Sequence, residues 1–288
     1  MDEPGLLVID KPAGLTSHQV VGRVRRVFGT RKVGHAGTLD PMATGVLIVG
    51  LNRATRLLGH LALHDKAYRA TIRLGGATTT DDADGEPLGG ADASSLDRAA
   101  IEAALVPLRG QILQRPSTVS AIKVAGKRAY ARAREGEDVI LAPRPVTVSR
   151  FAAVALRVGD RFCDVDVEVE CSSGTYVRAL ARDLGDALGV GGHLTVLRRT
   201  RIGRYTLADA VELDTLTVST PLMTMAEAAR LSFPCIRVDA AAARDVSYGR
   251  PLAIEVRCDP TGVIGPDGTL LALYRPGETG ARPVAVLV

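Results

Sequence analysis

The strongest constraint on the fold is a stretch of strictly alternating side chains at residues 163–171. One set is apolar or a thiol and the other is acidic; the two sets are Cys163, Val165, Val167, Val169 and Cys171, and Asp164, Asp166, Glu168 and Glu170. A period of two places successive side chains on opposite faces of a strand. Residues 67–74 alternate in the same way, with Tyr68 in the buried set. Both stretches therefore predict strands with one face in the core and one in solvent.

Helices are expected between such strands. Residues 16–29 and 176–189 carry apolar side chains at helical spacing, and each stretch ends at a glycine. A third helix is expected to begin at Ser94 or Ser95 and to end near Leu105. The chain therefore combines helices and strands.

Two segments faintly resemble metal sites, and neither completes the pattern. His60 and His64 stand four residues apart, but the intervening residues lack the glutamate of a metalloprotease helix. Residues 80–85 read TDDADG, but Ala91 stands where a calcium-binding loop needs glutamate. We interpret the second segment as an acidic surface loop.

The length of 288 residues allows one large domain with a small appendage. Residues 232–234 read as a linker, and residues 235–288 hold short apolar runs between glycines and prolines, which predicts a small β-rich domain. No apolar run is long enough to span a membrane, and the acidic N-terminus does not fit a signal peptide. Four cysteines without a C-x-x-C pair are expected to be reduced, buried thiols in a cytosolic protein.

Positive charge is modest overall, at +4, but it is unevenly distributed. Eight lysines and arginines share residues 11–60 with a single acid, and nine share residues 109–150 with three acids. Blocks of this kind indicate a face that binds a polyanion. A solvated arginine-rich surface is the other interpretation.

The single acid of the first basic block is Asp40, in the segment GHAGTLDPMATG at residues 34–45. Neighbouring positive charge favours the ionised carboxylate. Such a carboxylate can serve as a nucleophile or a general base. An aspartate before a proline is also ordinary turn chemistry, so a purely structural turn is the alternative.

Arg178 is expected in the first turn of the helix that follows Tyr176. A cation at this place opposes the helix dipole, which points to an anion nearby. A solvent-exposed arginine is the alternative. Residues 111–150 are rich in lysine and arginine and suit a flap over a phosphate backbone; the alternative is a surface excursion.

Five segments, in order, resemble motifs of the TruB type of bacterial tRNA pseudouridine synthase. They are KPAG at 11–14, GHAGTLDPMATGVL at 34–47, KAYRA at 66–70, SAIKVAGKRAY at 120–130 and CSSGTYVR at 171–178. Each motif alone is weak, whereas five in one order are specific. The match covers roughly residues 5 to 205.

The resemblance implies an α+β fold: a central mixed, largely antiparallel sheet with flanking helices, followed by a small β-rich, PUA-like C-terminal domain. The catalytic domain would span residues 1–232 with an RNA-clasping insertion at about 111–150, and the PUA-like domain would span residues 235–288. The implied reaction isomerises uridine 55 in the T-loop of tRNA to pseudouridine. The resemblance further implies no cofactor, no metal, a monomer and a cytoplasmic location.

The resemblance also implies residue roles. Asp40 would be the catalytic carboxylate, Tyr68 would stack on the uracil, and Arg178 would pair with Asp40. His35 would fill the space that the flipped base leaves, and Leu197 would line the uracil pocket. Three basic residues of the insertion would contact phosphates; they are Lys123, Lys127 and Arg128.

Two other functions remain open at this stage. A non-catalytic RNA-binding or RNA-folding protein would show salt-sensitive tRNA binding without product. A glycoside hydrolase would also act at an anomeric carbon, but it usually needs two close carboxylates. No second acid lies in the Asp40 segment.

Overall fold

The computed structural model describes residues 3–118, 123–124, 127–128 and 141–288, with the backbone alone for 123–124 and 127–128. The chain folds as two compact units. The first comprises Met1–Pro41, Gly45–Ala62 and Gly203–Val288, and the second comprises Met42–Thr44 and Leu63–Ile202. Among the described residues, no helix is both long and apolar enough to cross a membrane.

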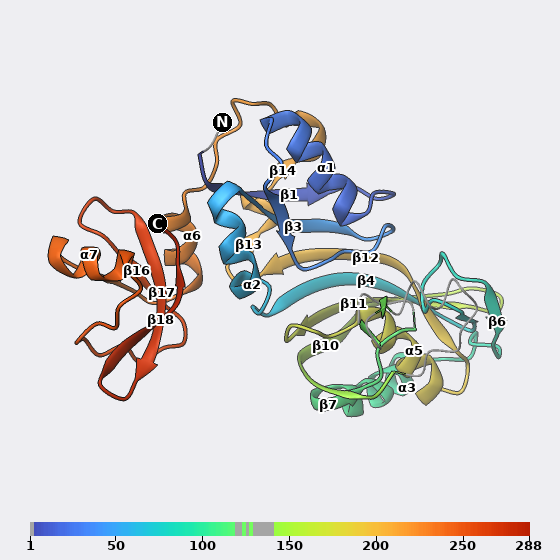
Figure 1. Ribbon diagram of the computed structural model, residues 1–288. Coiled ribbons are helices and arrows are strands. Elements are labelled where there is room, and N and C mark those ends of the chain that lie inside the picture. Colours follow the sequence, from blue (N-terminus) through green and yellow to red (C-terminus); the bar gives the residue numbers. More distant parts are fainter. Residues whose placement is uncertain (1–2, 119–122, 125–126, 129–140) are drawn as a thin grey trace. The chain divides into compact units, whose positions relative to one another are not determined.

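The first unit contains strands in both relative directions (Figure 1). β1 (Gly5–Lys11) pairs antiparallel with β3 (Thr44–Leu51) and parallel with the short β14 (Val211–Glu212). β2 (Val33–Ala36) pairs antiparallel with β3. Shorter elements complete this part of the unit; they are η1 (Asn52–Leu57), α2 (Leu58–Leu61), β13 (Tyr205–Thr206), η3 (Leu207–Asp209) and η4 (Leu213–Thr215).

The helix α1 (Ser17–Phe28) follows the sequence prediction closely. Thr16 and Gln19 form a reciprocal capping box at its start, and Gly29 ends it with φ of 63°. Its valines join side chains of β1 and β3 in one buried cluster. Local signals therefore define the helix, and burial of its apolar stripe fixes it on the sheet.

The C-terminal part of the first unit holds a separate four-stranded sheet, as predicted. Its strand order is β15-β16-β17-β18, with β15 parallel to β16 and the rest antiparallel. The bounds are β15 (Cys235–Arg237), β16 (Thr261–Ile264), β17 (Leu270–Gly277) and β18 (Gly280–Val286), with helices α6 (Met225–Ser232) and α7 (Ala240–Ser247). The domain bounds at 232 and 235 and the PUA-like character stay predictions.

The second unit is built on antiparallel strands in the order β12-β4-β11-β10-β7. Their bounds are β4 (Lys66–Leu74), β7 (Gly110–Gln114), β10 (Arg144–Val158), β11 (Cys163–Cys171) and β12 (Gly192–Ile202). The predicted alternation is confirmed in β11, where the cysteine and valine positions are buried and the acidic positions are half-buried. Together the two units confirm a mixed, largely antiparallel α+β fold.

Two helices cover the second unit's strands (Figure 1). α5 (Val177–Ala187) packs against β12, α3 (Arg98–Leu105) packs against β10, and the two helices contact each other. The predicted start of α3 was wrong, because the Asp97 carboxylate, rather than Ser94 or Ser95, accepts the first capping hydrogen bond. Short elements complete the unit; they are β5 (Ala77–Thr78), β6 (Pro87–Gly89), η2 (Val106–Leu108), β8 (Lys123–Val124) and β9 (Lys127–Arg128).

The cysteines follow the prediction in part. All four are free thiols. Cys163 and Cys171 are buried, Cys235 is half-buried, and Cys258 is exposed. The expectation of buried thiols was therefore wrong for Cys258, which lies before the strand β16 rather than within the small sheet.

Candidate active site

The loop that carries Asp40 is anchored on both sides of this residue within the first unit. On one side, Leu39 is buried and exchanges two hydrogen bonds with the Ser17 hydroxyl in α1, at 2.9 and 3.1 Å. On the other side, the carbonyl of Pro41 accepts a hydrogen bond from the Gly14 N–H at 2.8 Å. Asp40 itself is half-buried. The backbone at this carboxylate is therefore held by neighbouring segments rather than by the loop alone.

Lys11 supplies a second anchor for the same loop. Its side chain is fully buried at the end of β1, and its ammonium donates to three carbonyls, those of Pro12 at 2.8 Å, Leu15 at 2.6 Å and Pro41 at 3.2 Å. An ammonium has three N–H donors, and burial without partners would be costly. Lys11 thus ties the end of β1 to the residue that follows Asp40.

His35 lies in β2, two strands from Lys11 in the first unit. It pairs with Val49 of β3, and its ring is half-buried. The His18 ring of α1 meets it edge-on, with centroids 5.4 Å apart. His35 is therefore held against α1.

Tyr68 and Leu197 lie on adjacent strands of the second unit. Tyr68 is 7% exposed in β4, and Leu197 is 6% exposed in the adjacent β12. Leu197 lies opposite Ala70, two residues from Tyr68 on the same strand. Residues opposite each other in an antiparallel pair share a face, so Leu197 and Tyr68 are diagonal neighbours on one face.

Two buried basic side chains, Lys66 and Arg199, lie at this end of β4. Lys66 is 7% exposed and lies opposite Cys171, and its ammonium donates to the His64 carbonyl at 2.7 Å. Burial, followed by the charge of nearby Arg199, lowers the pKa of Lys66 to about 8. Burial also raises the pKa of the Cys171 thiol to about 11. The folded protein therefore disfavours the charged form of the Lys66 side chain.

Arg178 is buried in the first turn of α5, with 4% of its surface exposed, so the solvent-exposed alternative is wrong. Its Nη1 donates to the Thr80 carbonyl at 2.8 Å and lies 3.5 Å from the Asp82 carboxylate. The predicted anion near this cation is thus found, and within the second unit it is Asp82. Sequence reasoning missed Asp82 as a functional candidate.

The loop that carries Asp82 is only in part the acidic surface loop that the sequence indicated, because Asp84 is exposed but the two preceding aspartates are not. Asp81 and Asp82 are both buried. The Asp82 carboxylate accepts from the Thr80 hydroxyl and from the Asp84 N–H at 3.2 Å, and its backbone carbonyl accepts from the Thr78 hydroxyl at 2.7 Å. The interpretation failed for Asp81 and Asp82 because arginines of α5, which lie far away in the sequence, pair with these two carboxylates.

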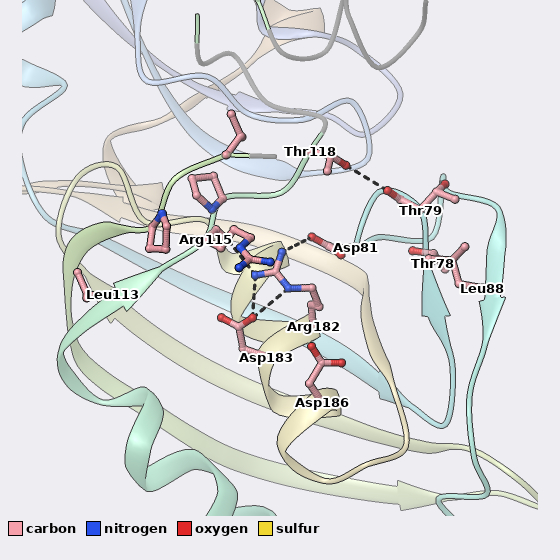
Figure 2. A pocket seen from close by; sticks show the side chains of 13 residues that line it. Thr78, Thr79, Asp81, Leu88, Leu113, Arg115, Thr118, Arg182, Asp183 and Asp186 are labelled. Atoms are coloured by element: carbon pink, nitrogen blue, oxygen red, sulfur yellow. Dashed lines mark hydrogen bonds and ion pairs between the residues drawn. The ribbon is translucent and has the colours of Figure 1, made fainter. Parts of the chain in front are cut away.

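A cavity of about 590 Å³ adjoins this loop and α5 (Figure 2). Its charged lining comprises Asp81, Asp183, Asp186, Arg115 and Arg182. Arg182 lies one helical turn after Arg178 and contacts Asp81 at 3.2 Å and Asp183 at 2.7 Å. Burial raises the pKa of both Asp81 and Asp183, although the Arg182 charge opposes the shift. Arginines at 178 and 182 therefore hold consecutive aspartates of one loop.

The predicted site residues fall into three groups. Asp40 and His35 lie in the first unit, and Tyr68, Arg178 and Leu197 lie in the second. The pairing of Arg178 with Asp40 stays a prediction, because the two residues belong to different units. The side chains of Lys123, Lys127 and Arg128 lie outside the described residues, as does Tyr130; the structure describes only the antiparallel pairing of β8 with β9.

Models of known families match nearly the whole chain in three consecutive parts. Residues 25–177 match the N-terminal domain of the TruB family of pseudouridylate synthases. Residues 178–231 match a C-terminal domain of tRNA pseudouridylate synthase B, and residues 233–288 match the C-terminal domain of tRNA pseudouridine synthase II.

Individual proteins and solved structures agree with the family models. The chain is 60% identical to tRNA pseudouridine synthase B of Cutibacterium acnes over 99% of both chains, and 54% identical to that of Thermobifida fusca over 98% of both. Among solved structures, it resembles a chain of a Cbf5–Nop10–Gar1 complex with a TM-score of 0.75 and 25% identity, covering 99% of this chain and 85% of the other. A chain of an archaeal box H/ACA Nop10–Cbf5 complex matches with a TM-score of 0.71 and 26% identity, covering 99% and 86%.

Proposed function

Because the chain belongs to the TruB family of pseudouridylate synthases, we propose that it isomerises a uridine of tRNA to pseudouridine, and that this uridine is number 55 in the T-loop. The observation that carries the proposal is 60% identity to a tRNA pseudouridine synthase B over 99% of both chains. The five motifs in one order support the same substrate. As a tRNA-modifying enzyme the protein would act in the cytoplasm, as a monomer.

In the proposed reaction, Asp40 acts at the sugar of a nucleotide that has left the base stack. The N1–C1′ bond breaks, the uracil rotates within the site, and C5 bonds to C1′. The proton on C5 is lost and N1 gains one, so the product is an isomer of the substrate. The anchoring of Leu39 and Pro41 supports this role, because a reacting carboxylate needs a fixed backbone.

The uracil would be held by the face that Tyr68 and Leu197 share. A tyrosine ring can stack on a base, and an apolar leucine beside it excludes water from the pocket. Their diagonal placement on β4 and β12 supports this assignment. Stacking is tolerant of rotation, which suits a base that must turn before C5 can react.

Arg178 would pair with Asp40 and keep its carboxylate ionised and oriented. The contacts of Arg178 with Thr80 and Asp82 are compatible with this pairing, because a guanidinium carries five N–H donors. In this arrangement Asp82 would orient Arg178, and Arg178 would orient Asp40. Lys123, Lys127 and Arg128 would contact the tRNA backbone, where basic side chains contribute position and affinity.

The proposal is tested by incubating the purified protein with an unmodified T-stem-loop transcript and mapping pseudouridine by carbodiimide adduct formation and primer extension. Pseudouridine is expected at position 55 and is expected to be lost when that uridine is replaced by cytidine. Salt-sensitive binding of the transcript without product would instead support the non-catalytic RNA-binding alternative. Product at other uridines after the replacement would contradict the choice of position 55.

A further inference from the structure

The start of α5 differs from the starts of the other described helices of comparable length. Four helices of eight or more residues begin at a residue whose side chain accepts a capping hydrogen bond; these residues are Thr16, Asp97, Thr224 and Asp239. At α5 the corresponding residue is Tyr176, whose side chain makes no such bond. The helix that carries Arg178 therefore lacks the usual local anchor.

A side chain from another strand supplies the anchor. Gln114, the last residue of β7, is 1% exposed. Its Oε1 accepts from the Tyr176 N–H at 2.8 Å, and its Nε2 donates to the Tyr176 carbonyl at 3.0 Å. One buried amide thus bonds to both backbone groups of the residue at which α5 begins, and the Tyr176 carbonyl also accepts the helical hydrogen bond from the Leu180 N–H at 3.2 Å.

The next residue continues the attachment. The carbonyl of Arg115 accepts from Nη2 of Arg182 at 2.8 Å, one helical turn beyond Arg178. Figure 2 shows Arg115 beside Arg182 and the ion pair of Arg182 with Asp81. Residues 114–115 therefore hold α5 on both sides of Arg178, while the loop at residues 80–82 holds the Arg178 guanidinium.

We propose that Gln114 is a positioning residue for the isomerisation: through the backbone of Tyr176 it fixes the first turn of α5 and thereby the Arg178 guanidinium. This inference rests on the proposed function, in which Arg178 acts beside the reacting nucleotide. Small displacements matter in such a site, since a misplacement of about 1 Å can cost about 100-fold in rate. In this proposal Gln114 acts through Tyr176 and Arg178 and does not itself contact the substrate.

The decisive variant is Gln114→Glu, which keeps the shape of the side chain. The introduced carboxylate can still accept the hydrogen bond from the Tyr176 N–H. Its second oxygen cannot donate, so it faces the Tyr176 carbonyl oxygen without a hydrogen bond. As a protonated acid it regains a donor and restores both bonds. Burial raises the pKa of the introduced carboxyl, so the acid form should return within the working pH range.

The measurement is the single-turnover rate constant on the T-stem-loop, taken as the ratio of variant to wild type between about pH 8 and about pH 5.5. The ratio is expected to be about 0.1 or lower at the alkaline end and to rise toward 1 as the pH falls. Gln114→Met loses both bonds, so its ratio should be low and independent of pH. RNA affinity should stay close to wild type in both variants.

Gln111→Glu is the matched control, because Gln111 lies on the same strand and is exposed. Its ratio should remain near 1 at every pH. A ratio near 1 at all pH values for folded Gln114→Glu and Gln114→Met would overturn the proposal. So would a reduced ratio for Gln114→Glu that does not recover at low pH.

Hydrogen exchange of the backbone amides at residues 176–180 separates this inference from the proposed function. Faster exchange is expected in Gln114→Met, and in Gln114→Glu at alkaline pH, but not in Gln111→Glu. If the wild-type protein forms no pseudouridine, the proposed function is wrong. If the exchange rates in Gln114→Met equal those of wild type, Gln114 does not anchor the start of α5, whatever the activity of the variant.

Discussion

At the scale of single residues, two buried lysines have opposite environments. Lys11 is satisfied by three carbonyls, so its charge is stabilised where it lies. Lys66 donates to the His64 carbonyl and lies near Arg199, and burial, followed by the Arg199 charge, lowers its pKa to about 8. The first lysine therefore fastens the Asp40 loop, and the second is a group whose charge the fold disfavours.

Lys11→Met should loosen the Asp40 loop. The substitution removes the buried ammonium that bonds to three carbonyls, of which the Pro41 carbonyl keeps another donor, the Gly14 N–H. We expect a loss of about 1–3 kcal/mol in the free energy of unfolding. Urea unfolding measures this loss. Lys32→Met, at an exposed position before β2, is the control and should change stability little. Equal stability of both variants would contradict the anchoring role of Lys11.

Lys66 should give the protein a stability that rises with pH. Because its pKa is lower in the folded chain than in the unfolded chain, the unfolded chain binds more protons between about pH 8 and about pH 10.5. The free energy of unfolding should therefore increase across this window, by about 3 kcal/mol at most. Urea unfolding of wild type and Lys66→Met at several pH values isolates the effect. If the free energy of unfolding depends on pH identically in both proteins, Lys66 does not cause the increase.

At the scale of elements, α5 is the part on which the second unit's site depends. It carries Arg178 and Arg182, receives Gln114 at its start, and packs closely on β12. Gly185 makes the close packing possible, because a Cβ there would overlap the backbone of Gly192. Displacement of this helix should therefore affect both stability and turnover.

Asp82→Asn should weaken the attachment of its loop to α5. Arg178 would stay buried with a neutral partner, and breaking a buried ion pair costs about 3–5 kcal/mol. We expect lower stability and slower pseudouridine formation, measured by urea unfolding and single-turnover kinetics. Asp84→Asn, in the same loop but exposed, is the matched control. A stable, fully active Asp82→Asn variant would show that Arg178 does not need this carboxylate.

Gly185→Ala should force α5 away from β12. Overpacking of this kind costs about 1–3 kcal/mol, and here the opposing atoms are backbone that cannot rotate away. The control is Gly22→Ala in α1, where no atom lies near the added methyl group, and a gain of about 0.5–1 kcal/mol is expected. Thermal unfolding distinguishes the two. If Gly185→Ala unfolds at the same temperature as wild type, α5 can shift away from β12 without loss of stability.

At the scale of the whole molecule, local signals predict the elements and long-range contacts decide the site. The caps of α1 and the alternation of β11 act over a few residues, so the sequence alone reveals them. The start of α3 was misplaced because Ser94, Ser95 and Asp97 are all suitable caps and only tertiary structure selects one.

The burial of Asp81 and Asp82 could not be predicted from their own segment. It depends on arginines that follow Tyr176, and the spacing of Arg178 and Arg182, one helical turn apart, was the only available signal. Gln114 carried no signal at all, because its role arises from the position of β7 beside the start of α5. Motif resemblance supplied the remaining roles, which spacing alone does not define.

The account depends most on Asp40 as the carboxylate that acts at the sugar. The direct measurement is pseudouridine formation at position 55 of a T-stem-loop transcript by Asp40→Asn, with Asp160→Asn at an exposed position as the control. We predict that Asp40→Asn binds the transcript but reacts more than about 1,000-fold more slowly than wild type, whereas Asp160→Asn reacts normally. Product formation by Asp40→Asn at a rate close to wild type would contradict the account.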